Sequence, residues 1–205
     1  MTSILTVLMA VVGYLLGSIS TSILVAKIMG NIDIREHGSG NAGATNTLRV
    51  LGKKAAAFVV LGDALKGVAA ILISMLLCRI FSVNSSLPNY AAGLFAVLGH
   101  NFPLYFGFKG GKGVLTSIVT VMMLDWSIGL IVFVIAIAIM AVTKYVSLGS
   151  CVGAVILIIA ATVLRIGNLP FVMLCWVLAI LVIVRHKTNI KRLLNGTESK
   201  LGSKK

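Results

Sequence analysis

Residues 4–29 read ILTVLMAVVGYLLGSISTSILVAKIM, an apolar run whose only charged residue is Lys27. A helix of about 20 apolar residues is enough to cross the hydrocarbon core of a bilayer. The run is too long for the core of a signal peptide, and no small-residue cleavage site leads from it into a soluble chain. It therefore predicts a membrane-spanning helix that is retained in the protein.

The composition of the whole chain supports the same class of protein. Its 205 residues are 59% hydrophobic and only 11% charged, and the mean hydropathy is +1.07. These values lie outside the range of soluble globular proteins. Seven apolar segments follow one another with short connections: 4–29, 55–80, 90–108, 114–124, 127–145, 148–164 and 169–184. We expect an all-α integral membrane protein, a seven-helix transmembrane bundle.

The segment 114–124 is the short one, with 11 residues. If 90–108 and 114–124 formed a re-entrant hairpin, the bundle would have five spans. Lys109 and Lys112 would then lie inside the membrane, at about 2.5 to 3.5 kcal/mol each, so seven spans are favoured. One polytopic domain is expected over residues 1–194, followed by a short basic cytoplasmic tail at 195–205.

The positive charge predicts the orientation. Eighteen Lys and Arg face five Asp and Glu, a net charge of +13. With the N-terminus outside, 15 of the 18 cations lie at the cytoplasmic face, as the positive-inside rule requires. The excess of Lys and Arg is therefore assigned to topology and to phosphate-bearing substrates, and no nucleic acid partner is expected.

Other residue types exclude some chemistry. The five acidic residues are dispersed and offer no carboxylate cluster for a two-metal site, so no metal is expected. Cys78, Cys151 and Cys175 lie inside apolar runs without ligand spacing and are expected to be packing residues.

A polar stretch, Gly38 to Asn46, separates the first two apolar runs and reads GSGNAGATN. Glycines allow backbone N–H groups to approach an anion, and the other residues supply short polar side chains. The pattern G-x-G-x-x-G is present, but a dinucleotide site needs a preceding strand and a βαβ unit. An anion-binding loop and a flexible polar turn remain the two interpretations.

A second glycine-rich stretch, GFKGGKG at 107–113, carries Lys109 and Lys112. It resembles a phosphate loop only loosely, because Gly113 stands where Ser or Thr would be required. Free N–H groups and the positive helix end at Val114 nevertheless favour an anion beside Lys112. The alternative, that the two lysines are topology signals, does not explain the glycines.

Three ionisable residues are expected within the apolar segments. Asp63 and Lys66 are spaced i, i+3 and can pair on one helix face, bracing the bundle. His100 is either functional or a buried neutral histidine bonded to a backbone carbonyl.

The last cluster, RHKTNIKR at 185–192, continues the final apolar segment. As a helix it places His186 and Asn189 on one face. A basic amphipathic tail on anionic lipid is the alternative, but it leaves this pair without a role. His186 is the candidate acid or base, since histidine titrates near neutrality.

Long motifs now resemble one family. They are Gly13–Ser18, Asp33–Arg35 with 38–46 and 51–53, Leu98–Pro103 with 108–114, Tyr145–Leu148, and Arg185–Leu193. In content and order they are similar to the bacterial acyl-phosphate-dependent glycerol-3-phosphate acyltransferases, the PlsY family. The chain is identified as a member on this resemblance, which covers nearly its whole length. It lacks the H-x-x-x-x-D pair of the common glycerolipid acyltransferases.

The resemblance implies transfer of a fatty acyl group from acyl phosphate to the 1-hydroxyl of sn-glycerol 3-phosphate, without a cofactor. It implies acyl phosphate binding by Ser39, Gly40, Asn41, Thr45, Gly110, Gly111 and Gly113. It implies glycerol 3-phosphate binding by Arg49, Lys112, Ser147, His186 and Asn189. Ser39, Lys112, His186 and Asn189 are the expected catalytic residues, with Asn189 orienting the hydroxyl.

The same resemblance implies a bacterial cytoplasmic membrane and transient contact with the soluble enzyme that makes acyl phosphate. The active site is expected to face the cytoplasm, because the predicted orientation puts the glycine-rich stretches on that side. Two alternatives from other classes remain open. A transporter of a phosphorylated metabolite would also use glycines and cations, but no internal repeat relates the two halves. A lipid-binding scaffold explains the basic tail and leaves the glycine-rich stretches unexplained.

Overall fold

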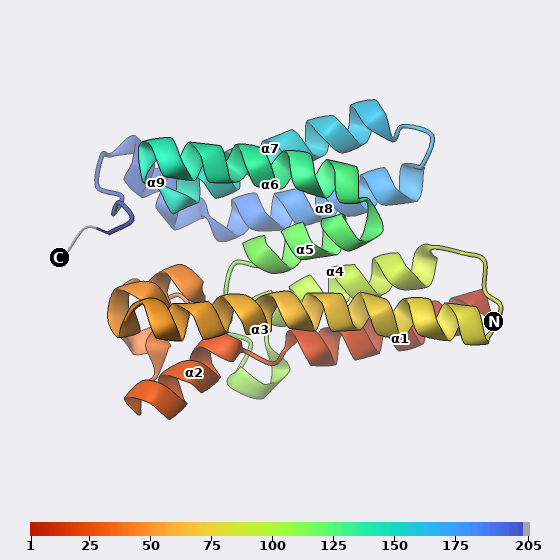
Figure 1. Cartoon of the computed structure of the whole chain (residues 1–205), viewed down its shortest axis with the longest axis horizontal. Coiled ribbons are helices and arrows are strands. Elements are labelled where there is room, and N and C mark those ends of the chain that lie inside the picture. Colours follow the sequence, from red (N-terminus) through yellow and green to blue (C-terminus); the bar gives the residue numbers. More distant parts are fainter. Residues whose placement is uncertain (203–205) are drawn as a thin grey trace. The chain divides into compact units, whose positions relative to one another are not determined.

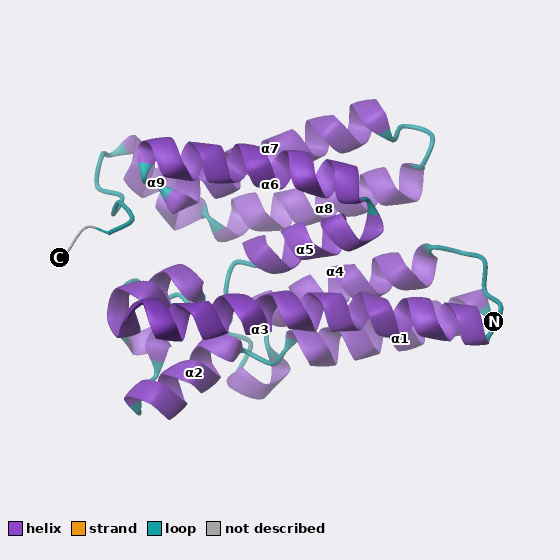
Figure 2. Cartoon of the chain, in the orientation of Figure 1, coloured by secondary structure: helices purple, strands orange, loops and turns teal. Residues whose placement is uncertain are grey.

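A computed structural model describes residues 1–202. Within this range the chain forms nine α-helices and two short 3₁₀-helices, and no strand (Figure 2). The prediction of an all-α protein is confirmed. The chain divides into two compact units, unit 1 at Met1–Leu124 and unit 2 at Asp125–Lys205. Lys204 and Lys205, which belong to the predicted basic tail, lie outside the described residues.

Unit 1 holds five α-helices (Figure 1). Their bounds are α1 Thr2–Gly17, α2 Thr21–Gly30, α3 Ala44–Ile80, α4 Leu87–Asn101 and α5 Val114–Leu124, with 3₁₀-helices at Ile34–Glu36 and Leu104–Phe106. The bounds of α5 are those predicted from the apolar segment. The loops that follow α2 and α4 contain the two glycine-rich stretches.

Small residues bring α1 and α4 into backbone contact. A Cβ atom added to Gly13 would overlap the Ala92 carbonyl, and one added to Gly17 would overlap the Ala96 carbonyl. Apolar attraction between helices is weak in lipid, so small residues that allow close van der Waals packing join such helices. Tyr14 adds a hydrogen bond from its hydroxyl to the Phe102 carbonyl at 2.8 Å.

The structure corrects two predicted segments of unit 1. The run 4–29 is interrupted at 18–20, where the Ser18 hydroxyl accepts a hydrogen bond from Leu104 N–H and Lys66 donates to the Ile19 carbonyl. Lys66 thereby satisfies the Ile19 carbonyl, which a continuous helix would have paired locally. The helix predicted to run to residue 108 ends at Asn101, ahead of Pro103, which cannot donate a helical hydrogen bond.

Unit 2 holds α6 Trp126–Thr143, α7 Val146–Leu164, α8 Leu169–Arg185 and α9 Lys187–Leu194. Gly149 of α7 lets the helix lie close to α6, because an added Cβ would come within 2.6 Å of the Ala136 carbonyl. The helical continuation predicted after residue 184 is present, but α8 and α9 are bent by 58°. His186 lies at this bend.

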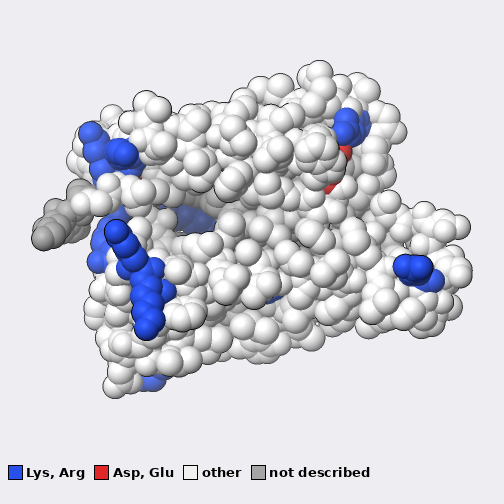
Figure 3. Space-filling model, viewed as in Figure 1, with Lys and Arg blue, Asp and Glu red and all other residues white. Residues whose placement is uncertain are grey.

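Four segments within the described residues are long and apolar enough to cross a membrane, namely 2–30, α3, α6 and α7. The bent pair α8 and α9 brings the number to five. Their outer faces carry large exposed apolar side chains such as Val142 at 83% and Ile28 at 82% exposed. Such side chains fit contact with lipid better than contact with water. Figure 3 shows the corresponding scarcity of charge, since Lys and Arg occupy only a few places on the face drawn.

Candidate active site

The first glycine loop, Gly38–Asn46, is held in shape by its last residue. Asn46 is 1% exposed, and its side-chain oxygen accepts a hydrogen bond from Ser39 N–H at 2.8 Å. Its amide nitrogen donates to the Ile34 carbonyl at 3.1 Å and the His37 carbonyl at 2.9 Å. A fully bonded buried amide is a strong local constraint. The loop is therefore an ordered structure and not a flexible turn.

Glycine is required at two positions of this loop. Gly38 has φ +62° and Gly40 has φ +71°, in the left-handed region that other residues rarely adopt. A Cβ at Gly38 would also overlap the Asn46 side-chain oxygen. The glycines thus permit both the backbone path and the approach of Asn46.

The first glycine loop opens onto the N-terminus of the longest helix. Gly43 is the N-cap of α3, no side chain caps this end, and its first turn contains no acidic residue. Free N–H groups and the helix dipole favour an anion there. Thr45 is half-buried and Arg49 is exposed one turn later, an i, i+4 pair on one helix face. The predicted Ser39 and Asn41 lie in the same loop, with Ser39 exposed.

The second glycine loop, Gly107–Gly113, opens onto α5 in the same way. Gly107 has φ +65° and Gly113 has φ +75°, again values that favour glycine. Lys112, just before the helix, is half-buried. A Cβ at Gly113 would lie 2.6 Å from the side-chain oxygen of Asn101, which is completely buried. The loop therefore packs tightly against the end of α4.

The two glycine loops contact each other within unit 1. Gly111 lies against the first loop, because a Cβ added to it would be 2.6 Å from the Ala42 carbonyl. Ala42 also belongs to a buried cluster with Ile34, against which Phe106 packs. The residues predicted to bind acyl phosphate come from positions some seventy residues apart, and the fold brings their loops together.

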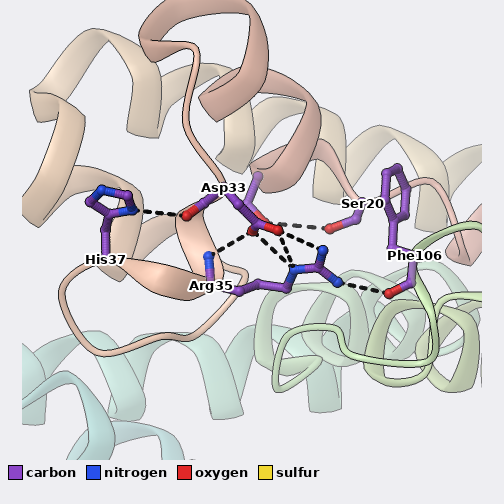
Figure 4. A network of polar contacts seen from close by, with 6 residues as sticks. Ser20, Asp33, Arg35, His37 and Phe106 are labelled. Atoms are coloured by element: carbon purple, nitrogen blue, oxygen red, sulfur yellow. Dashed lines mark hydrogen bonds and ion pairs between the residues drawn. The ribbon is translucent and has the colours of Figure 1, made fainter.

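An arginine joins the two 3₁₀-helices that precede these loops (Figure 4). Arg35 Nη2 forms an ion pair with Asp33 Oδ2 at 2.6 Å, and Arg35 Nη1 donates to the Phe106 carbonyl at 2.8 Å. The hydrogen bond from Arg35 is the main cause that holds the pKa of Asp33 below its ordinary value, against the effect of burial. His37 Nδ1 lies 2.9 Å from the Asp33 carbonyl oxygen. The segment ahead of Gly38 is thereby fixed in place.

Some N–H groups of the glycine loops already have acceptors. Gly40 N–H donates to the His37 carbonyl at 3.0 Å, and Gly111 N–H donates to the His100 carbonyl at 3.1 Å. These amides stabilise the loops in this structure. Gly40 and Gly111 can still lie at an anion site as predicted. In this structure, however, their own N–H groups are used inside the protein.

In unit 2, the bend between α8 and α9 fixes the orientation of His186. The side chain is 3% exposed, and Nδ1 lies 2.7 Å from the Val182 carbonyl oxygen. A carbonyl oxygen only accepts, so Nδ1 carries a proton. In the neutral ring Nε2 is then the nitrogen that can accept a proton or a hydrogen bond.

Ser147 and Asn189 are joined by an acidic residue that the sequence did not single out. Ser147 Oγ donates to Glu198 Oε1 at 2.7 Å, and Asn189 Nδ2 donates to the same oxygen at 2.6 Å. Arg192 Nε forms an ion pair with the other oxygen at 2.7 Å. Three elements, α7, α9 and the segment after α9, thus meet at one carboxylate.

The charge state of Glu198 follows from these contacts. Burial raises the pKa of the carboxyl, but hydrogen bonds from Arg192, Asn189 and Ser147 favour the ionised form and bring the pKa below its ordinary value. Glu198 is therefore a carboxylate at neutral pH. Its position in a basic tail, as the only acid after Asp125, was the signal available in the sequence.

The predicted site residues fall into two groups. Unit 1 contains Ser39, Gly40, Asn41, Thr45, Arg49, Gly110, Gly111, Lys112 and Gly113, and unit 2 contains Ser147, His186 and Asn189. Asn46 and Glu198 are supporting residues that the sequence analysis missed. The only signal for Asn46 in the sequence is that it is a polar residue in a glycine-rich stretch. The only signal for Glu198 is that it is an acidic residue among basic ones.

The fold and the two glycine loops define a multi-pass helical membrane protein with loops of the kind that bind anions at helix N-termini. A model of the glycerol-3-phosphate acyltransferase family matches residues 7–196, and the chain belongs to that family. The predicted family is thus confirmed, and the transporter and scaffold alternatives receive no support.

Individual relatives agree with this assignment. The glycerol-3-phosphate acyltransferase of Clostridioides difficile (strain 630) is 48% identical over 199 residues, 97% of each chain. That of Shouchella clausii (strain KSM-K16) is 50% identical over 201 residues, 94% of each chain. The crystal structure of PlsY (YgiH), an integral membrane glycerol 3-phosphate acyltransferase, in its glycerol 3-phosphate form matches with a TM-score of 0.86 and 38% identity over 96% of each chain. Its lysophosphatidic acid form matches with a TM-score of 0.83 and 37% identity.

Proposed function

We propose that this protein transfers a fatty acyl group from acyl phosphate to the 1-hydroxyl of sn-glycerol 3-phosphate, forming lysophosphatidic acid and phosphate. The observation that carries the proposal is the match, at a TM-score of 0.86, to a glycerol 3-phosphate acyltransferase in its glycerol 3-phosphate form. A second form of that protein holds lysophosphatidic acid. Acceptor and product of the proposed reaction therefore both occur with this fold.

The two glycine loops support acyl phosphate as the donor. Each opens onto a helix N-terminus, at Ala44 and at Val114, and neither helix has an acidic residue in its first turn. A phosphate group is favoured at such an end. The proposed donor-binding residues are Ser39, Gly40, Asn41, Thr45, Gly110, Gly111 and Gly113. The acyl chain of the donor would lie among apolar helix faces.

Glycerol 3-phosphate binding is assigned, by family resemblance alone, to Arg49, Lys112, Ser147, His186 and Asn189. Arg49 and Lys112 supply positive charge for the phosphate. Asn189 would orient the attacking hydroxyl, with Glu198 holding its amide nitrogen. Ser147 is held by the same carboxylate.

In the reaction, the 1-hydroxyl oxygen attacks the acyl carbonyl carbon, and the bond from that carbon to the phosphate oxygen breaks. The hydroxyl proton passes to the departing phosphate. Since acyl phosphate already has a good leaving group, positioning and electrostatic stabilisation of the developing oxyanion would supply most of the rate. His186 acts in this scheme as a phosphate ligand in its protonated form, in which Nε2 also carries a proton and donates to a phosphate oxygen.

The proposal includes the membrane topology: seven spans with the N-terminus outside, in the bacterial cytoplasmic membrane, and a site facing the cytoplasm. It rests on the 15 of 18 cations that this orientation places inside. Reporter fusions at the C-terminus would test it. A cytoplasmic fluorescent protein should be active there and an exported phosphatase inactive; the reverse pattern would overturn the orientation.

One assay tests the activity. Purified protein in detergent receives acyl phosphate and labelled glycerol 3-phosphate, with acyl-CoA in a parallel reaction. We expect labelled lysophosphatidic acid with acyl phosphate as the donor and not with acyl-CoA. No second protein should be needed for the reaction. Product only from acyl-CoA would overturn the donor assignment, and no product from either donor would overturn the function.

A further inference from the structure

A cluster of three ionisable side chains lies in unit 1 and has no role in the proposed reaction. Asp63 and Lys66 belong to α3 and His100 to α4, and they are 4%, 6% and 7% exposed. The predicted ion pair is confirmed, with Lys66 Nζ 2.9 Å from Asp63 Oδ1. Buried ion pairs contribute little net stability compared with apolar packing. Bracing two helices is therefore a weak explanation for this cluster.

The contact with a charged Lys66 favours one tautomer of His100. Lys66 Nζ lies 3.0 Å from the Ile19 carbonyl oxygen and 2.8 Å from His100 Nδ1. Asp63 Oδ1 is farther from Nδ1, at 3.5 Å. An ammonium group only donates, so Nδ1 accepts and Nε2 carries the proton. His100 is buried, as one of its two predicted interpretations requires, and its Nδ1 faces the Lys66 side chain.

His100 contacts the second glycine loop at two points. Its carbonyl oxygen accepts the Gly111 N–H at 3.1 Å. Its ring lies against the same residue, because a Cβ added to Gly111 would overlap His100 Nε2. The Ala42 carbonyl borders that added atom too, at 2.6 Å. Gly111 is therefore enclosed by the His100 ring and by the first glycine loop.

We propose that His100, held by Lys66 and Asp63, is a positioning residue that sets the contact between the two glycine loops at Gly111. This inference rests on the proposed function, in which both loops hold the donor phosphate. The ring acts on the backbone of the loops and not on the substrate. α3 supplies Asp63 and Lys66, and its N-terminus follows the first glycine loop, although the helix is kinked at Gly52 between these two parts.

Two substitutions of His100 distinguish the contact that Nδ1 makes with Lys66 from the contact that Nε2 makes with Gly111. His100→Asn retains an acceptor near Nδ1 for Lys66 but does not reach Gly111. His100→Gln retains a donor near Nε2 but removes the acceptor of Lys66. We expect His100→Asn to raise the KM for acyl phosphate about tenfold with a smaller change in thermal stability. We expect His100→Gln to lower the thermal stability more and the KM less.

A purely structural role predicts a different result, in which His100→Gln is worse in both measurements or both variants lose activity only in proportion to unfolded protein. Either outcome would overturn the inference. Ser74→Ala is the matched control, because Ser74 is a completely buried polar residue of the same helix. It should leave the KM for acyl phosphate unchanged.

A second measurement does not depend on activity. Hydrogen–deuterium exchange of peptides covering 38–46 and 107–113 should be faster in His100→Asn than in the wild type, without any substrate. Unchanged exchange in both peptides would overturn the inference even if the wild type used another donor. If neither His100 variant folds, Lys66→Arg provides the same exchange test, because it keeps the charge but displaces the ring.

Discussion

Asn189 donates its side-chain N–H to Glu198 Oε1 at 2.6 Å, so the residue proposed to orient the attacking hydroxyl is itself oriented by a carboxylate nine positions later. The same oxygen accepts the Ser147 hydroxyl, 51 positions away. Glu198 is thus placed to fix two proposed ligands of glycerol 3-phosphate at once. Its substitution should affect the acceptor substrate more than the donor.

We expect Glu198→Ala to raise the KM for glycerol 3-phosphate about tenfold or more, because Ser147 and Asn189 lose their common acceptor. The KM for acyl phosphate should change little. Steady-state kinetics with each substrate varied in turn would measure this. The control is Glu36→Ala, which removes an exposed carboxylate for which the structure assigns no site role. An equal rise in both KM values would show a general loss of structure.

The lowered pKa of Glu198 also predicts a pH dependence of stability. A carboxyl whose folded pKa lies below its unfolded value of about 4.3 contributes stability above that value. This contribution is lost as the pH falls through the folded pKa. Between about pH 5 and about pH 2 the wild type should therefore lose more thermal stability than Glu198→Gln, as measured by thermal unfolding in detergent. Parallel curves would contradict the assigned charge state.

His186→Gln tests whether the histidine is a ligand or a base. As a phosphate ligand, its substitution raises the KM for glycerol 3-phosphate about tenfold and leaves the pH profile of turnover in place. As a general base, its substitution would abolish turnover at unchanged KM and remove a pH limb near the ordinary pKa of histidine, about 6.5. We expect the first result.

Ser39→Ala should lower kcat/KM for acyl phosphate by about 10- to 100-fold, since a hydrogen bond to a charged phosphate is lost. Because Ser39 is exposed and binds the loop through its backbone N–H, the fold should remain intact. Ser86→Ala, at an exposed serine without a side-chain cap bond, is the control. Normal kinetics in Ser39→Ala would remove this residue from the donor site.

Asn46→Ala should lower the free energy of unfolding by about 1 to 3 kcal/mol, because the Ser39 N–H and the Ile34 and His37 carbonyls lose their bonds to the buried amide. It should also weaken acyl phosphate binding through disorder of the first glycine loop. Asn46→Asp keeps the acceptor for Ser39 N–H and loses the donor toward His37, so its effect on exchange at 38–40 should be smaller. Hydrogen–deuterium exchange separates the two variants.

The sequence by itself determined the membrane class, the helical fold and the place of both glycine loops. The transfer of an apolar segment into lipid depends on the residues of that segment alone. An apolar run such as 114–124 therefore predicts a helix with the same bounds, and α5 has them. Glycine and short polar residues likewise mark a loop wherever they cluster. The end of α4 at Asn101 was not predicted, because apolar residues continue to 108, although Pro103 is a local signal for it. The bend at His186 was not predicted, because residues 185–192 contain neither proline nor glycine.

Only the tertiary structure decided which polar groups become partners. Lys66 reaches the interruption at Ile19 and the ring of His100, and Gly111 fits between that ring and Ala42. Sequence spacing suggested the Asp63–Lys66 pair because i, i+3 residues share a helix face, but it gave no sign of a third partner on α4. Contacts between segments depend on how helices pack, and packing is a property of the whole chain, so the positions of the catalytic groups emerge only when the chain is folded.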